Sequence, residues 1–295
     1  MADDEAAEVR RLWSALGLPG VIDVHTHFMP KSVMDKVWQY FDSAGPLVGR
    51  EWPINYRTAE SERVHMLREF GVRGFTALVY PHKPQMAAWL NQWALQFSQE
   101  TPDCLATATF YPEPDAGEYV AAAIDRGARV FKAHIQVGRY EPNDPLLDPV
   151  WGAIEDARTP VVIHCGSGPA PGEHTGPEPI RSLLQRYPRL RLIVAHMGMP
   201  EYEDFMDICE NSADVRLDTT MAFTPFVDEV MPFPSPLGHR LRDLGDRILF
   251  GSDFPNIPYS YADAMRSLTR LPGVDDSWLR GAFYGNAAAL FDLTA

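Results

Sequence analysis

Short apolar runs rich in β-branched residues alternate with amphipathic segments along the whole length of this 295-residue chain. The apolar runs predict strands and the amphipathic segments predict helices, because each pattern has the periodicity of its element. We expect strands over 21–28, 75–80, 104–110, 128–135, 160–166, 191–198, 215–221 and 248–254. We expect helices between them over 59–70, 86–100, 115–126, 147–158, 177–187 and 201–211.

This alternation indicates a parallel sheet, and runs such as PVVI and LIVA are apolar throughout, as in strands covered on both faces. Eight strands with helical spacers predict an α/β protein, a (β/α)8 TIM-type barrel formed as a single domain over 1–295. A doubly wound open sheet is the alternative, but no GxGxxG motif follows the first strand. We also expect a short N-terminal helix over about 3–17 and a long loop over about 29–58.

Three connections are long or rich in glycine and proline, and each follows the carboxyl end of a predicted strand. They cover residues 29–58, 166–176 and 220–237. Active sites of such barrels are built on that side, and long loops in compact domains usually serve function. We therefore expect at least one of these connections to cover a substrate.

The charge and cysteine content narrow the function classes. The formal net charge of −14 argues against a nucleic-acid partner and against electrostatic membrane binding, since both need clustered cations. Three cysteines without a CxxC motif fit a reducing compartment. The acidic start lacks the pattern of a signal peptide, and no apolar run is long enough to span a bilayer. The sequence predicts a cytoplasmic protein that acts on a small molecule.

The strongest chemical signal is the segment IDVHTHF, which ends the first predicted strand. His25 and His27 are two residues apart, so both side chains are expected on one face of the strand. Two imidazoles placed in this way can share one cation.

Three further polar residues end later strands in the same manner: PVVIH ends in His164, LIVAH in His196 and ILFGSD in Asp253. One such histidine would be an ordinary buried residue. Four histidines and an aspartate at strand ends would converge on one point if the barrel closes. The set therefore predicts a metal centre.

The pattern of HxH on the first strand, histidines on the fifth and sixth and aspartate on the eighth resembles the amidohydrolase superfamily. The chain is most similar to the branch that contains aminocarboxymuconate-semialdehyde decarboxylase, aromatic-acid decarboxylases and lactone and amide hydrolases. The resemblance extends from IDVHTHF to the closing YGNAAALF. It implies His25, His27, His164 and Asp253 as ligands of one divalent ion, with zinc expected and manganese or iron as alternatives.

The resemblance also implies that His196 and Asp253 are catalytic. A divalent ion with three or four protein ligands keeps a position for water and lowers the pKa of that water. Asp253 could accept the proton of the water, and His196 could protonate or orient the substrate.

ARVFKAHI ends the fourth predicted strand and brings Lys132 and His134 to one face. In dinuclear relatives a carboxylated lysine at this strand bridges two ions, and His164 and His196 would then hold the second. The overall similarity favours one ion, with Lys132 as a cation for an anionic substrate or as the partner of a core carboxylate. His134 either contacts the substrate or makes a structural hydrogen bond.

Two aspartates near the strand ends are further candidates. Asp23 is expected to bond a ligand histidine or a backbone amide, and Asp218 is a weaker candidate for the site. The leading functional hypothesis is a metal-dependent hydrolase of an amide, lactone or ester. The alternatives are a non-oxidative decarboxylase of an aromatic or unsaturated acid and a non-catalytic metal-binding barrel. The relatives suggest a homodimer, by analogy alone.

Overall fold

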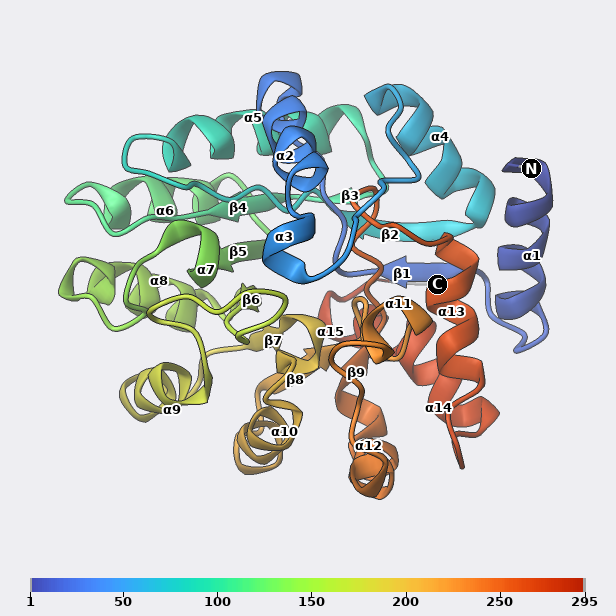
Figure 1. Cartoon of the computed structure of the whole chain (residues 1–295). Helices are drawn as coiled ribbons and strands as arrows, with labels where there is room; N and C mark the ends of the chain where they lie inside the picture. The colour runs from blue at the N-terminus through green and yellow to red at the C-terminus, as the bar shows by residue number, and fades with distance from the viewer. Residues whose placement is uncertain (1, 294–295) are drawn as a thin grey trace. The chain divides into compact units, whose positions relative to one another are not determined.

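The computed structural model describes residues 2–293, and its chain contacts divide these residues into two compact units. The first unit combines 2–27, 32–75 and 218–293, and the second combines 28–31 and 76–217. Figure 1 shows the order of the elements along the chain. In the described part of the chain, no helix is long and apolar enough to cross a membrane.

The second unit contains a run of parallel strands with helices between them. Its strands are β3 (Cys104–Leu105), β4 (Thr107–Thr109), β5 (Val130–His134), β6 (Val161–His164), β7 (Leu192–Val194) and β8 (Val215–Asp218), whose last residue belongs to the first unit. Its helices are α5 (Ala87–Glu100), α6 (Ala116–Asp125), α7 (Ile135–Gly138), α8 (Asp148–Ala157), α9 (Pro177–Arg186) and α10 (Tyr202–Asn211), with 3-10 turns η1 (Pro145–Leu147) and η2 (Ala195–Gly198).

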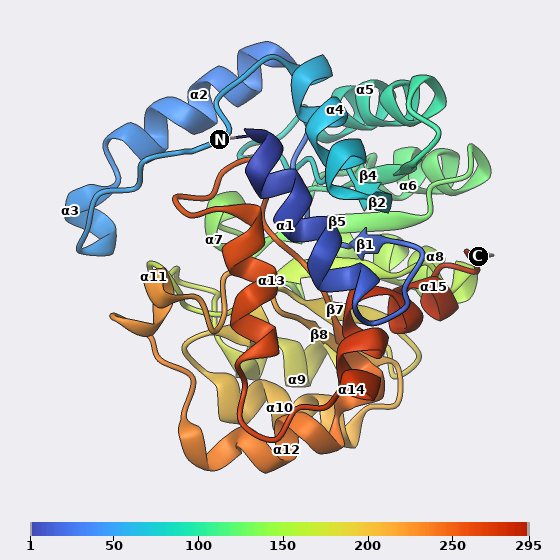
Figure 2. The same ribbon diagram turned by 90° about the vertical axis from the view of Figure 1, so that its right-hand side faces the viewer.

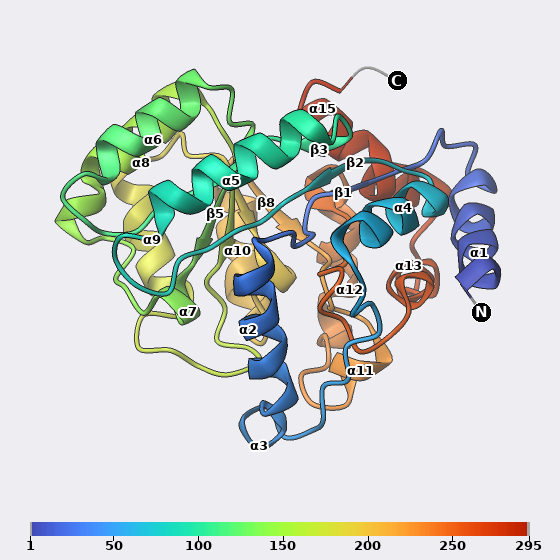
Figure 3. The ribbon, with the colours of Figure 1, turned by 90° about the horizontal axis from the view of Figure 1, so that it is seen from above.

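Strands β4 to β8 lie side by side in chain order, each parallel to the next. Nearly every residue of these strands is buried, as expected of a parallel sheet with both faces covered. The register places His134 beside His164. Helices α6 and α8 pack against each other on the outside of these strands, as Figures 1 and 3 show.

The first unit contains β1 (Val21–Asp23), β2 (Val72–Thr76), whose last residue belongs to the second unit, and β9 (Ile248–Leu249). Strand β1 pairs in parallel with β2. Its helices are α1 (Ala2–Ser14), α2 (Lys31–Asp42), α3 (Gly45–Val48), α4 (Glu60–Phe70), α11 (Pro225–Asp228), α12 (Gly238–Asp243), α13 (Tyr261–Thr269), α14 (Asp276–Arg280) and α15 (Asn286–Leu290). The first residue of α2 belongs to the second unit. Short 3-10 turns η3 (Ser235–Leu237) and η4 (Gly245–Arg247) and a π turn η5 (Gly281–Gly285) complete it.

Helix α1 packs against α4 and α13, and Figure 2 shows it alongside α13. Trp13 at the end of α1 donates a hydrogen bond to the Phe70 carbonyl at 2.9 Å. A Cβ on Gly71 would lie 2.7 Å from the Trp13 ring, and Gly71 has a φ of 82°. Only glycine fits this left-handed helix end beneath the indole.

The six predicted helices are confirmed as α4, α5, α6, α8, α9 and α10 with ends shifted by at most one residue. Most predicted strands are present but shorter, and that at 104–110 is split into β3 and β4. The strand predicted at 75–80 was misplaced, because β2 begins at Val72 and ends at Thr76. The segment 29–58, expected as a loop, contains α2 and α3. The α2 sequence KSVMDKVWQYFD has apolar residues at helical spacing, with Met34 buried, so the loop interpretation overlooked an amphipathic helix.

Candidate metal centre

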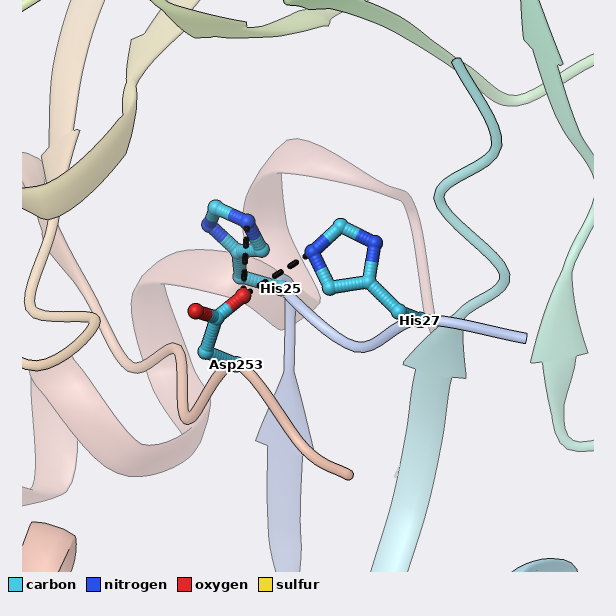
Figure 4. A group of neighbouring side chains, drawn as sticks. All are labelled: His25, His27 and Asp253. Carbon is cyan, nitrogen blue, oxygen red and sulfur yellow. Dashed lines mark ion pairs between the residues drawn. The ribbon is translucent and has the colours of Figure 1, made fainter. Parts of the chain in front are cut away.

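Three predicted ligands, His25, His27 and Asp253, meet within the first unit. Asp253 Oδ1 lies 2.9 Å from His27 Nε2 and 3.5 Å from His25 Nε2, as the dashed lines in Figure 4 show. One donor atom of each side chain lies within 4.8 Å of the others, and all three residues are buried. Ligands of one tetrahedral zinc ion lie about 3.4 Å apart, given Zn–N and Zn–O distances of about 2.1 Å. The spacing of these donors fits a single divalent ion.

The two histidines lie just beyond β1 rather than on it, because β1 ends at Asp23. Backbone hydrogen bonds tie this segment to the residues that follow β9: Asp253 N donates to the His25 carbonyl at 2.8 Å, and His27 N donates to the Phe254 carbonyl at 2.7 Å. Asp253 has a φ of 70°, a left-handed conformation uncommon for residues other than glycine. The surrounding backbone holds the carboxylate toward the histidines despite this conformation.

Asp218, the last residue of β8, fixes the orientation of the His25 ring. Its Oδ2 lies 2.9 Å from His25 Nδ1, and both side chains are buried. A carboxylate accepts hydrogen bonds, so Nδ1 carries the hydrogen and Nε2 keeps its lone pair for a cation. Asp218 therefore performs the positioning that usually accompanies a metal-bound histidine. This role was only weakly indicated by the sequence, because the pairing joins residues 193 positions apart.

Asp23 bonds to the backbone rather than to a ligand ring, the second of the two expectations for it. Its Oδ1 accepts from the His25 and Ser252 amides, both at 3.1 Å. Its Oδ2 accepts from Ser252 Oγ at 2.6 Å and from Tyr261 OH at 2.9 Å. Burial raises the pKa of Asp23 to about 7, although these hydrogen bonds oppose the shift. Asp23 thus joins the segment that carries His25 to the segment that carries Asp253.

Tyr261 connects this aspartate to the N-terminal helix. Ser260 caps the start of α13 by accepting from the Asp263 amide at 3.0 Å, which sets the position of Tyr261 at the first turn. The Tyr261 amide donates to Tyr56 OH at 2.6 Å, and Tyr56 OH donates to Glu5 on α1 at 2.5 Å. A chain of hydrogen bonds therefore runs from α1 to the metal-site segment, and all but the bond to Glu5 are buried.

Close packing around His25 requires a glycine at position 251. A Cβ at that position would lie 2.2 Å from Thr220 Oγ1 and 2.8 Å from His25 Cβ. Any larger residue would displace the histidine or the threonine. The sequence ILFGSD thus combines the ligand Asp253 with a glycine that lets the two segments approach.

The second unit brings together the other three predicted histidines. The His134 and His164 rings stack with centroids 4.1 Å apart, and the His196 ring lies 4.7 Å from His164. His164 Nε2 lies 3.0 Å from the Gly168 carbonyl. A carbonyl only accepts, so Nε2 carries the hydrogen and Nδ1 is the nitrogen that could bind a metal. Because His164 belongs to the second unit, its assignment as a ligand stays a prediction.

The backbone around these three histidines contains a left-handed turn and a position that requires glycine. His196 and Met197 follow β7 with φ values of 57° and 56°, so the predicted strand 191–198 ends early. A Cβ on Gly166 would lie 2.5 Å from the Met199 carbonyl, which requires glycine where the loop after β6 meets this turn. His134 Nδ1 accepts from the Val137 amide at 3.3 Å and caps α7, a structural hydrogen bond.

Lys132 on β5 is fully buried, and it shares the strand with His134. Among residues 2–293, only His25, His27 and Asp253 form a set of three His, Cys, Asp or Glu side chains with donor atoms this close together. A single ion stays the prediction, with a second ion held through Lys132 and His134 as its alternative.

Comparisons with known structures show the same fold. An uncharacterised TIM-barrel protein from Bordetella bronchiseptica shares 18% identity, with a TM-score of 0.75 over 92% of this chain and 98% of that chain. The 5-carboxyvanillate decarboxylase from Novosphingobium aromaticivorans, solved with manganese and 4-hydroxy-3-methoxy-5-nitrobenzoic acid, shares 17% identity, with a TM-score of 0.61 over 94% and 97% of the two chains. These likenesses confirm the predicted (β/α)8 fold.

A third structure, a probable 2-pyrone-4,6-dicarboxylic acid hydrolase from Acinetobacter baumannii, shares 16% identity, with a TM-score of 0.63 over 93% of this chain and 100% of that chain. No curated protein matches the chain. The Amidohydrolase family model matches residues 22–293. The chain therefore belongs to the amidohydrolase family, as its strand-end histidines and aspartate predicted.

Proposed function

We propose that the protein is a metal-dependent hydrolase of a small amide, lactone or ester. The observation that carries this proposal is the approach of His25 Nε2 and His27 Nε2 to Asp253 Oδ1, with Asp218 holding the His25 ring. Two imidazoles and a carboxylate suit zinc, and manganese is the metal in one structural relative. His164 would complete the ligand set through Nδ1.

When bound, the ion would lower the pKa of a water molecule and polarise the substrate carbonyl. Asp253 would accept a proton from the attacking water, because its second carboxylate oxygen is not needed to hold the ion. His196 would protonate the leaving group or orient the carbonyl. Lys132, which is fully buried on β5, would provide a positive charge for an anionic substrate. The three cysteines are buried and form no disulfide within residues 2–293, and we propose a cytoplasmic location on this ground.

A non-oxidative decarboxylase is the second candidate, and it is supported by the likeness to the 5-carboxyvanillate decarboxylase. The activated water would then protonate a ring carbon of the substrate as carbon dioxide leaves. The retained HxH pair leans toward hydrolysis, because some aromatic-acid decarboxylases of this branch carry glutamate at the first position. A homodimer is proposed by analogy with the wider superfamily alone.

The test is to load the protein with zinc or manganese and supply two panels of substrates. One panel contains lactones and amides, including 2-pyrone-4,6-dicarboxylate, and ring opening is followed by ultraviolet absorbance. The other contains aromatic acids, including 5-carboxyvanillate, and released carbon dioxide is measured. Hydrolysis that disappears in Asp253→Asn supports the proposal. Carbon dioxide release alone would favour the second candidate, and activity that survives Asp253→Asn would contradict both.

A further inference from the structure

The first unit contains a hollow that contributes nothing to the metal centre. It has a volume of about 700 Å³ and lies among the residues that follow β8, the helix α12 and the end of α13. Small-molecule sites commonly measure about 300–1,000 Å³. None of His25, His27, Asp218 or Asp253 lines it. The hollow is therefore large enough for a ligand of its own.

Its walls are apolar and stiff. Phe223, Phe233, Leu241 and Leu271 provide the apolar surface, and four prolines lie among the other lining residues. Proline fixes the backbone φ angle, so the segments that carry these residues lose little freedom when a ligand binds. Phe223 is also held with a φ of 67°. The hollow is shaped before a ligand arrives.

Two arginines line the same hollow without a carboxylate partner. No carboxylate among residues 2–293 forms an ion pair with Arg242 or Arg270. Arg242 donates to the Pro272 carbonyl at 3.3 Å, and its guanidinium lies 3.1 Å from the place where a Cβ on Gly273 would be. This contact orients the guanidinium while leaving other N–H groups available for an anion.

The remaining ionisable groups at the hollow are Asp228 and His239. His239 Nδ1 donates to the Pro236 carbonyl at 2.9 Å, which leaves Nε2 available to a ligand. With two arginines against one aspartate, the local charge is positive in a chain whose net charge is −14. A cationic hollow in an acidic protein favours a negatively charged ligand.

We propose that this hollow is a second binding site, which takes a small apolar carboxylate such as an aromatic acid. The ring of the ligand packs against Phe223, Phe233 and Leu241, and its carboxylate binds Arg242 and Arg270. The site is independent of the metal centre and of the reaction proposed for it.

The test uses 1-naphthoate as the probe, with the neutral 1-naphthalenemethanol as its uncharged analogue, and isothermal titration calorimetry as the measurement. The metal-site variant His27→Ala separates the two sites, because binding at the hollow should remain in it. Arg242→Gln/Arg270→Gln removes the two cations, and Arg11→Gln/Arg126→Gln removes two arginines that do not line the hollow.

The proposal expects one naphthoate per chain in His27→Ala and binding about tenfold weaker in Arg242→Gln/Arg270→Gln made on the same background. The Arg11→Gln/Arg126→Gln control should bind as its parent does, and the alcohol should bind about tenfold more weakly than the acid. Naphthoate that fails to bind His27→Ala, or that binds the double variant equally well, would overturn the proposal. Neither result would bear on the metal centre.

Discussion

Two groups of histidines, one in each unit, are held by different chemical partners. Around His25 the carboxylates of Asp218 and Asp253 face the two ring nitrogens, whereas at His164 a backbone carbonyl faces Nε2. A carboxylate adds negative charge near an imidazole, but a carbonyl only selects its tautomer. The first group is therefore suited to hold a cation. In the second group, the Gly168 carbonyl leaves Nδ1 of His164 as the nitrogen proposed to bind the ion, and His134 and His196 lie beside that ring.

The largest effect should follow from Asp253→Asn, which removes the charge shared by the two histidines while keeping the shape of the side chain. We expect less than a tenth of the wild-type zinc content by elemental analysis and loss of measurable turnover. The circular dichroism spectrum should stay unchanged, which serves as the control for folding. A variant that retains one zinc ion per chain would contradict the claim that the group around His25 is the one suited to hold a cation.

His196→Gln tests the second group. If His196 acts on the substrate rather than on the ion, the zinc content should remain at the wild-type level and kcat should fall about 10²- to 10⁴-fold. Steady-state kinetics and elemental analysis of the same preparation check this. Zinc lost in proportion to activity would instead make His196 a ligand and would favour the dinuclear arrangement.

Asp218→Asn tests whether Asp218 acts by orienting the His25 ring. The amide keeps a hydrogen-bonding group near Nδ1 but removes the negative charge, so zinc affinity should fall about 10- to 100-fold. Competition with a chelator of known affinity measures the change. Because Asp218 acts through His25, the KM of a substrate should change less than the metal affinity. Equal losses in both would indicate that Asp218 contacts the substrate.

Tyr261→Phe should give the smallest effect. It removes one hydrogen bond to Asp23 and so lowers the free energy of unfolding by about 1 kcal/mol, measured by urea denaturation. If Tyr261 positions the metal-site segment, zinc affinity should also fall severalfold. Ser98→Ala, which removes a hydrogen bond on α5, is the matched control and should leave zinc affinity unchanged. A loss of stability without any change in affinity would limit Tyr261 to a structural role.

Much of this arrangement could be predicted from the sequence because the signals are local. Helices such as α5 and α8 follow from the spacing of apolar residues within one segment. The motifs HTH and GSD directly follow apolar runs, so each shows where its strand ends. The family assignment rests on the same motifs, and the match over residues 22–293 confirms it. The amphipathic pattern of α2 was equally local, and the loop interpretation simply overlooked it.

The tertiary structure alone decided which partners hold these side chains. Asp218 meets His25 across 193 positions, and Asp23 meets Tyr261 across 238, so no spacing rule could pair them. The strands also end earlier than predicted, because side-chain and loop hydrogen bonds around Asp23 and His196 replace the regular ladder. Local periodicity determines which elements form. Long-range packing determines the backbone distortions that give these side chains their final positions.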